Sequence, residues 1–468
     1  MATRMSTSLR SPSRGLSARI ASVGGVVLAL LLAGCSGSDS PETPVTSTDP
    51  SATSAEPSPT PAEPVTIDVW IADFASAEDM QGLIDRYTAE VAPHVTINYT
   101  HLPWQGIDEK VNVAAAGGTF PDLLGASAFQ LAPLAVDGLL APVDEYLAEP
   151  DYDFADVPAE LQPLGEVDGT PYIFMVGVDT QVLMINRTLF RDAGVAGLIP
   201  DETDRSWSRD NFVEAVEAIS ELPDTYGLGM WDVSPLHDKF LDSFIYNDGD
   251  QYTSEGNAEF TFNSSGNVEK YQWLVDVATS EASLPGMTGT TAQNVLDTFM
   301  QGNVGVMSHN EGWYGVIQAA IKDGTAAPDL DVMLVHYPTA DGSPGAVNAY
   351  PRGLVIKDQD DTARQEAAAD FAQWLTSGQD EGVNDVLLKK NIPVRASLVD
   401  GVPYDELKAI NGMQEKVIRP VYAIPDYPQF RAIWFAIRQP LFAPNPPYDA
   451  EEALRRFEAE ASPLLDRG

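Results

Sequence analysis

The alternation of β-branched and amphipathic segments from residue 65 onward is the feature that most limits the folds open to this chain. Residues 65–71 (VTIDVWI) and 95–99 (VTINY) are typical of strands, and apolar side chains recur at helical spacing over 80–91 between them. A helix over 110–116 and a strand starting at residue 121 continue the order. Because strand–helix–strand units pair their strands in parallel, this order predicts an α/β fold.

The pattern repeats in a second stretch, so the chain is long enough for two lobes. Strands are predicted at 181–186, 304–307 and 332–335, with helices between them. The chain has 468 residues, more than one hydrophobic core usually serves, and 44% of them are hydrophobic. We therefore expect two α/β blocks, each with its own core.

The first 64 residues read as an export signal followed by a linker. Residues 1–35 contain four arginines, no acid and an apolar run, and that run is shorter than the ~20 residues of a membrane anchor. Cys35, the one cysteine, ends the run as Leu-Ala-Gly-Cys and resembles a bacterial lipobox. The alternative is a free cysteine in a plain signal peptide. Residues 36–64 hold seven prolines and no aromatic or basic residue, and we expect a disordered linker.

The charge and the missing motifs exclude several classes of function. The formal net charge is −42, and beyond residue 35 only 23 basic residues face 69 acidic ones, so the chain is not suited to bind nucleic acid. The five histidines lack metal-ligand spacing, and neither a phosphate-binding loop nor a nucleophile elbow occurs. We expect no cofactor, metal or catalytic residue. A pair of glycosidase carboxylates could still lie among the 69 acids, so a tethered glycan-active hydrolase stays open as the alternative.

Short segments spread over most of 65–440 recur in the order of one known family. They are AAGGTFPD at 115–122, DGLLAPVD at 137–144, VDGTPY at 167–172, VLMINRTLF at 182–190, SW at 206–207, FMQGNVGVM at 299–307, GW at 312–313 and IPVR at 392–395. In this order they resemble the family 1 extracellular solute-binding proteins, the maltose-binding-protein-like receptor lipoproteins of ABC sugar importers. Each segment alone is weak, and their shared order carries the resemblance.

The resemblance implies a periplasmic-binding-protein-like fold, with two α/β lobes joined by a multi-pass hinge around a central cleft. The lobes would be 65–178 with about 347–398, and 179–346 with about 399–468. The chain would be a monomeric, non-enzymatic receptor that binds a mono- or oligosaccharide and delivers it to the transmembrane subunits of an ABC permease. We expect it to be exported and lipid-anchored to the outer face of the bacterial cytoplasmic membrane.

Sugar binding needs aromatic rings for the C–H faces and polar groups for the hydroxyls. Trp313 is the leading candidate, because it follows a predicted strand in a polar loop, at a position that the resembling family uses for stacking. A core tryptophan under the loop is the alternative. Asn310, Glu311 and Tyr314 are its neighbouring candidates.

Two charged residues are expected near the crossing between the lobes. Asp179 interrupts an apolar strand, and an unpaired buried carboxylate there would be costly, so it should meet solvent, a ligand or an arginine. Arg352 is one of the few cations and lies with Tyr350 and Gly353 in a predicted cleft loop before a strand. A structural ion pair is an equally good interpretation for Arg352.

The remaining candidates stand at the ends of predicted strands or in a late helix. They are Asp73 and Phe74 after the first strand, Ser127, Trp231 and Asp232 after a later strand, and Trp434, in a segment that resembles a stacking helix of maltose-binding protein. Packing is the alternative role for Trp231, Asp232 and Trp434.

Overall fold

The computed structural model describes residues 63–104, 106–248, 251–254, 259–418, 424 and 426–467. The predicted signal, Cys35 and nearly all of the predicted linker lie outside the described residues, so those assignments stay predictions. Within the ranges described, no helix is both long enough and apolar enough to cross a membrane.

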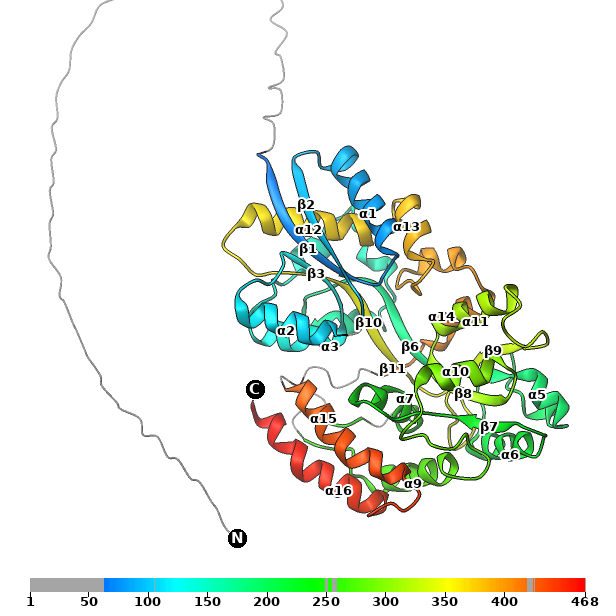
Figure 1. The fold of residues 1–468 in the computed structure, drawn as a ribbon. Coiled ribbons are helices and arrows are strands. Elements are labelled where there is room, and N and C mark those ends of the chain that lie inside the picture. Colours follow the sequence, from blue (N-terminus) through cyan, green and yellow to red (C-terminus); the bar gives the residue numbers. More distant parts are fainter. Residues whose placement is uncertain are drawn as a thin grey trace, which may run out of the picture. The chain divides into compact units, whose positions relative to one another are not determined.

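The described strands form a mixed nine-stranded sheet and a small separate pair (Figure 1). The sheet order is β2-β1-β3-β10-β6-β8-β7, with β11 paired to β10 and β9 paired to β6. The strands are β1 Val65–Ala72, β2 Val95–Leu102, β3 Leu123–Ser127, β4 Glu166–Val167, β5 Thr170–Pro171, β6 Phe174–Asn186, β7 Tyr226–Gly229, β8 Val304–Asn310, β9 Val332–Val335, β10 Val347–Ile356 and β11 Val417–Ile418.

Helices pack around this sheet. They are α1 Ala77–Arg86, α2 Ile107–Gly117, α3 Ala128–Val136, α4 Asp144–Leu147, α5 Arg187–Asp192, α6 Arg209–Ser220, α7 Asp238–Leu241, α8 Ser243–Tyr246, α9 Ser265–Ala278, α10 Ala292–Met300, α11 Trp313–Lys322, α12 Thr362–Thr376, α13 Glu381–Leu387, α14 Asp405–Met413, α15 Tyr427–Arg438 and α16 Ala450–Ala461. A 3₁₀ turn, η5, spans Pro235–His237.

Local sequence signals explain where several of these elements begin and end. Ser76 caps α1, because its Oγ accepts a hydrogen bond from the backbone N of Asp79 at 3.0 Å. Helix α2 ends at Gly118, whose φ of +69° is a conformation that glycine adopts without strain. Strand β1 pairs in parallel with both β2 and β3. The predicted parallel α/β arrangement is therefore confirmed for the first part of the chain.

Two long strands join the two parts of the sheet. The first half of β6 pairs with β10, and its second half pairs with β8 and β9 (Figure 1). One hydrophobic core holds residues from 67–178 and 349–394, and two others hold mainly residues from 182–347 and 402–464. The chain crosses again after residue 394. The structure thus has the predicted two α/β lobes with several crossings.

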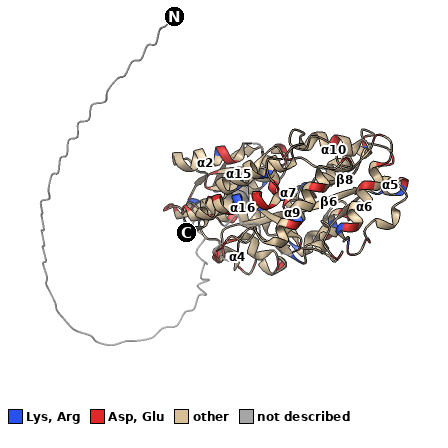
Figure 2. Ribbon diagram, turned by 90° about the horizontal axis from the view of Figure 1, so that it is seen from below, with Lys and Arg blue, Asp and Glu red and all other residues tan. Residues whose placement is uncertain are grey.

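The few cations are distributed unevenly. Acidic residues are spread along many of the helices (Figure 2). In contrast, five arginines of the described chain are buried, and each contacts carboxylate or carbonyl oxygens: Arg205, Arg352, Arg395, Arg431 and Arg438. Burying a guanidinium is costly unless it is paired, so these five residues mark places where the fold specifies exact geometry.

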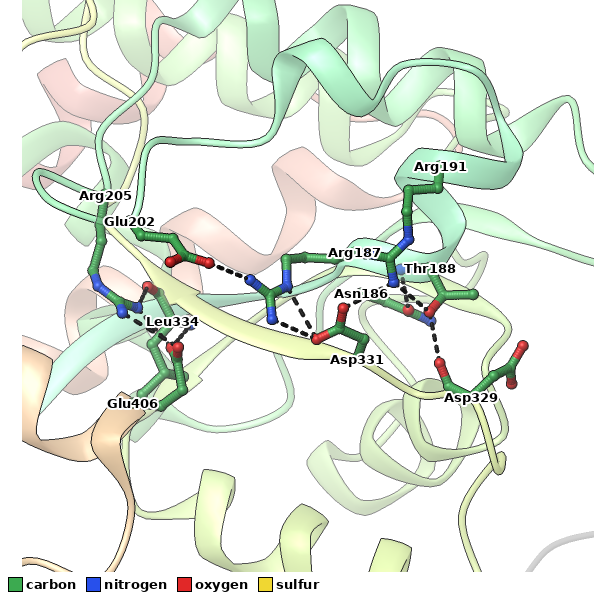
Figure 3. Close-up of polar contacts among 10 residues, drawn as sticks. All are labelled: Asn186, Arg187, Thr188, Arg191, Glu202, Arg205, Asp329, Asp331, Leu334 and Glu406. Carbon is green, nitrogen blue, oxygen red and sulfur yellow. Dashed lines mark hydrogen bonds and ion pairs between the residues drawn. The ribbon is translucent and has the colours of Figure 1, made fainter.

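One of them fixes a helix to the second lobe (Figure 3). Arg205 donates to both carboxylate oxygens of Glu406 at 2.6 and 3.2 Å and to the carbonyl of Leu334 at 2.9 Å. Glu406 also accepts from the Leu334 backbone N at 2.9 Å, so α14 is tied to strand β9. Nearby, Arg187 and Arg191 share Asp331 in a more exposed network.

Replacing Glu406 with Gln should lower the free energy of unfolding by about 1.5–3 kcal/mol, because the side chain of Arg205 is only 9% exposed and would lose its counter-charge. Arg191→Gln is the control, since that side chain is 50% exposed and its ion pair should contribute under about 1 kcal/mol. Urea unfolding of both variants measures the difference. Equal losses would contradict a special role for the buried pair.

Candidate ligand-binding site

A pocket of about 270 Å³ lies between elements of the two lobes. Its first-lobe wall comes from α2 and α3, and its second-lobe wall comes from η5 and α15. The lining residues are Asp108, Val111, Asn112, Pro133, Leu134, Pro235, Leu236, Tyr427, Pro428 and Arg431. The volume is near the lower end of small-molecule sites, and the lining is apolar with a few polar groups. None of these residues was among the candidates predicted from the sequence.

Arg431 is fixed on the second-lobe wall. Its Nε donates to Asp238 Oδ2 at 2.7 Å, and a terminal nitrogen donates to Oδ1. The guanidinium carbon also lies 5.3 Å from the centre of the Tyr427 ring. The neighbouring charge of Asp238 raises the pKa of Arg431, although burial opposes the shift. This pair holds α7 against α15 beside the pocket.

A buried charged cluster occupies the crossing strands. Arg352 Nε lies 3.2 Å from Asp179 Oδ1, an ion pair between β10 and β6. Glu311, directly after β8, is fully buried, and its Oε2 accepts from the Thr180 backbone N at 2.6 Å. Lys239 completes the cluster, with its ammonium 5.8 Å from the centre of the Tyr350 ring. We define the charged cluster as Asp179, Lys239, Glu311 and Arg352.

The electrostatics of this cluster follow from its burial. Burial and then the charge of Asp179 raise the pKa of Glu311 to about 8, while Arg352 opposes the shift. Burial lowers the pKa of Lys239, and Asp179 opposes that shift. The charge of Arg431 also lowers the pKa of Lys239, so the cluster interacts electrostatically with the wall of the pocket. Three of the predicted candidates, Asp179, Glu311 and Arg352, are thus brought together.

Trp313 begins helix α11, whereas the sequence predicted a loop. Its ring is half-buried and stacks on His309, with ring centres 3.8 Å apart and planes at 27°. The centre of the His309 ring in turn lies 5.2 Å from the ring centre of Trp231 and 4.8 Å from that of Phe240. His309 therefore supports the Trp313 ring from one side. Together with Trp231 and Phe240, these rings form an aromatic cluster near the ends of β7 and β8.

The predicted cleft loop is strand. Tyr350, Arg352 and Gly353 lie inside β10, between β3 and β6. Gly353 is required by packing, because a Cβ there would lie 2.2 Å from the carbonyl oxygen of Phe174. Tyr350 is 2% exposed. The loop prediction is therefore wrong, and the strand ladder itself places Arg352 beside Asp179.

Trp434 and Asp232 lie in the core of the second lobe. The Trp434 side chain is fully buried, its Nε1 donates to Asp242 at 2.9 Å, and its ring stacks on Phe457 at 4.4 Å. Asp232 is also fully buried and forms an ion pair with Arg438 at 2.7 Å. Both side chains have the structural packing role that was the alternative to ligand binding, so we leave them out of the site proposed below.

The remaining candidates are mostly buried. Phe74, Tyr314, Trp231 and Ser127 are 1%, 7%, 2% and 5% exposed, and Asn310 is half-buried beside His309. Asp73 is more open, with 39% of its side chain exposed, and pairs with Lys390 at 2.7 Å. Ser127 stands opposite Arg352 in the β3–β10 register.

Sequence analysis missed all of the residues that line the pocket, and also Asp238 and Lys239 beside it. A signal existed for Tyr427 and Arg431, because they stand four residues apart on one face of a helix and Arg431 is a rare cation. No comparable pattern marks Asp238 and Lys239, which reach the site only through the packing of α7.

Comparison with known proteins places the chain in a family. Residues 72–380 match the model of the bacterial extracellular solute-binding proteins, and the chain belongs to this family. The resemblance found in the sequence is thereby confirmed. A protein of Brucella abortus (strain 2308), named as a binding protein, is 20% identical over 252 residues, which are 51% of this chain and 59% of that protein. The chain thus spans about three fifths of the length of that relative.

Two further matches cover more of the chain. The maltotriose-binding protein of Pyrococcus abyssi is 21% identical over 392 residues, 81% of this chain and 78% of that protein. The solved structure of an ABC substrate-binding protein from Listeria monocytogenes in complex with cycloalternan superposes with a TM-score of 0.70. It is 18% identical and covers 86% of this chain and 99% of that one, so it shows the shared two-lobe fold. The family and these neighbours are binding proteins.

The carboxyl of Asp242, behind Trp434, predicts a pH effect on stability. Burial raises its pKa to about 7, although it accepts hydrogen bonds from Trp434, Tyr252 and Tyr271. Between about pH 4 and 7 the unfolded chain has lost this proton and the folded chain keeps it. Unfolding then releases a proton, so this group makes stability fall as pH rises, by about 1.4 kcal/mol per pH unit.

Asp242→Asn should remove that contribution, which unfolding titrations at several pH values would measure. Asp276→Asn, at an exposed acid of α9, is the control and should leave the wild-type slope unchanged. If Asp242→Asn has the wild-type slope too, the buried carboxyl is ionised and the argument from burial is wrong.

Proposed function

We propose that the protein is a non-enzymatic receptor that captures a carbohydrate between its lobes and delivers it to an ABC permease. The observation that carries the proposal is the pocket, whose walls come from both lobes. A ligand bound there contacts both walls fully only when the lobes approach each other, so it favours a closed form. A membrane partner can then distinguish the loaded receptor from the empty one.

The chemistry of the pocket suits a neutral polyhydroxy ligand. Leu236, Pro133 and Pro428 offer apolar surface for C–H faces, while Asp108 and Asn112 can bond hydroxyls. Asp179 and Arg352 lie on the crossing strands, and Glu311 and Trp313 follow the end of β8. The similarity to a maltotriose-binding protein and to a protein in complex with cycloalternan supports an oligosaccharide as the ligand.

The decisive experiment combines stabilisation with turnover. The purified full chain is heated with maltose, maltotriose, cycloalternan, a sugar phosphate and a short peptide, and each mixture is also assayed for products. A sugar present at 100 times its Kd should stabilise the fold by about 2.7 kcal/mol without being converted. Product formation that is lost on replacing one carboxylate would favour the hydrolase instead. Stabilisation by the peptide or phosphate alone would reject a carbohydrate receptor.

Export and anchoring complete the proposal. We place the signal at 1–35, the linker at 36–64 and the lobes at the boundaries predicted from the sequence, with a monomer tethered through Cys35. Membership in an extracellular family supports export. The acyl chains of a lipidated cysteine would supply the membrane affinity, at about 0.8 kcal/mol per buried methylene.

Cys35→Ser should therefore release the protein from the membrane fraction of a lipoprotein-processing bacterial host, because the acceptor thiol is gone. Immunoblots of membrane and soluble exported fractions measure the distribution. Ser36→Ala, next to the cysteine, is the matched control and should stay with the membrane. Retention of Cys35→Ser at the wild-type level would contradict lipid anchoring at this residue.

Trp313→Ala should weaken sugar binding about 10- to 100-fold, or ~1–3 kcal/mol, while the fold survives, if its half-buried ring stacks on the ligand. Titration calorimetry with the best sugar of the panel measures the change. Trp374→Ala is the control: that ring is partly buried against Tyr87 and Phe371 in the first lobe, so its loss should affect stability and leave affinity unchanged. Unchanged affinity of Trp313→Ala with lowered stability would make Trp313 a core residue.

A further inference from the structure

Glu311 differs from every other predicted ligand contact because its carboxylate is entirely buried and still incompletely bonded. Its Oε2 accepts from the Thr180 backbone N at 2.6 Å, and its own backbone N donates to the Thr180 carbonyl at 3.2 Å. Its Oε1 has no hydrogen-bond partner among the described residues. With 0% exposure the side chain does not offer a surface to a ligand. Its effect on a ligand must therefore be transmitted by its neighbours.

Those neighbours include two of the predicted ligand contacts, Asp179 and Arg352. Thr180 directly follows Asp179 on β6, and Gln414 fixes the Thr180 hydroxyl at 2.7 Å. Asp179 pairs with Arg352 at 3.2 Å, and Arg352 also donates to the carbonyl of Lys390 at 3.4 Å. Glu311 thus holds the backbone of the residue next to Asp179, and so restrains the Asp179 end of the ion pair that the strand ladder brings together.

Charged groups from three neighbouring elements act on Glu311. They are Asp179 on β6, Arg352 on β10 and Lys239 on α7. The titratable His309 stands two residues before it, on β8. An ionised Glu311 would leave a charged oxygen unpaired in the interior and would compete with Asp179 for Arg352. A protonated Glu311 leaves only a hydroxyl to satisfy. The geometry therefore favours the neutral acid, and the pKa of about 8 agrees.

We propose that Glu311 is a positioning residue of the ligand site, which in its uncharged form holds Thr180 and thereby sets the Asp179–Arg352 pair in the geometry that binds the ligand. The proposal deepens the receptor function above and depends on it for the ligand. When Glu311 loses its proton, Arg352 is shared between two carboxylates and the pair moves. The loss of this one proton then lowers the affinity for the ligand as the pH rises through about 8.

The first test needs no ligand. In the full chain, the NMR signals of the Thr180 amide and the Arg352 Nε–H should shift together between pH 6.5 and 9.5, with one midpoint near 8. Glu311→Gln keeps an acceptor for the Thr180 amide and cannot ionise, so both signals should stay at their low-pH positions. In Lys239→Met the titration should persist. Loss of the titration in Lys239→Met but not in Glu311→Gln would assign it to the lysine and overturn the proposal.

The second test measures affinity, with maltotriose as the probe, by calorimetry at pH 6.5 and 9. Wild type should bind about tenfold more weakly at pH 9, whereas Glu311→Gln should keep its pH 6.5 affinity at both values. Glu311→Ala, which lacks the acceptor, should bind more weakly at both. The same alkaline loss in Glu311→Gln would overturn the positioning role. If wild type binds none of the sugars at any pH, the receptor function fails, and the ligand-free titration alone decides whether Glu311 holds the pair.

Discussion

The pairing of β6 with β10 is the constraint on which the rest of the structure depends. Each strand belongs to both parts of the sheet, because β6 leaves β10 after Thr180 and continues along β8 and β9. Antiparallel ladders fix register through backbone hydrogen bonds, and a slip by one residue would turn every side chain to the opposite face. The positions of Asp179 and Arg352 relative to each other are therefore set by the backbone. Loops and helices then supply the walls around them.

Particular elements show which parts of the fold could be predicted from the sequence. Strand β1, helix α1 and the parallel order of the first lobe follow from local patterns and were predicted. The first part of β10 was assigned to a loop because Pro351 and Gly353 are turn residues by local preference, and only strands on both sides keep them extended. The register that joins β10 to β6 is a long-range contact that no local pattern encodes.

The site shows the same division. Helix α15 carries a stripe of Tyr427, Arg431, Trp434 and Arg438, all buried. The sequence reveals the stripe, but not that its first turn lines the pocket while its later turns enter the core. That difference depends on where η5 and α9 pack against α15. The sequence alone therefore could not show that Tyr427, and not Trp434, lines the pocket. Residues brought by α7 carry still less signal, since a four-residue helix has no periodicity to recognise.

Cations are scarce in this chain, and at the crossing they are shared rather than paired one to one. Deep in the second lobe each buried arginine has a carboxylate of its own: Arg438 has Asp232 and Arg431 has Asp238. At the crossing, Arg352 faces both Asp179 and Glu311. Lys239 adds a second cation to the cluster, but burial lowers its pKa, so it compensates the second carboxylate less completely than a guanidinium would. In a fold with a net charge of −42, the crossing therefore groups two acids and two cations in one cluster instead of in separate ion pairs.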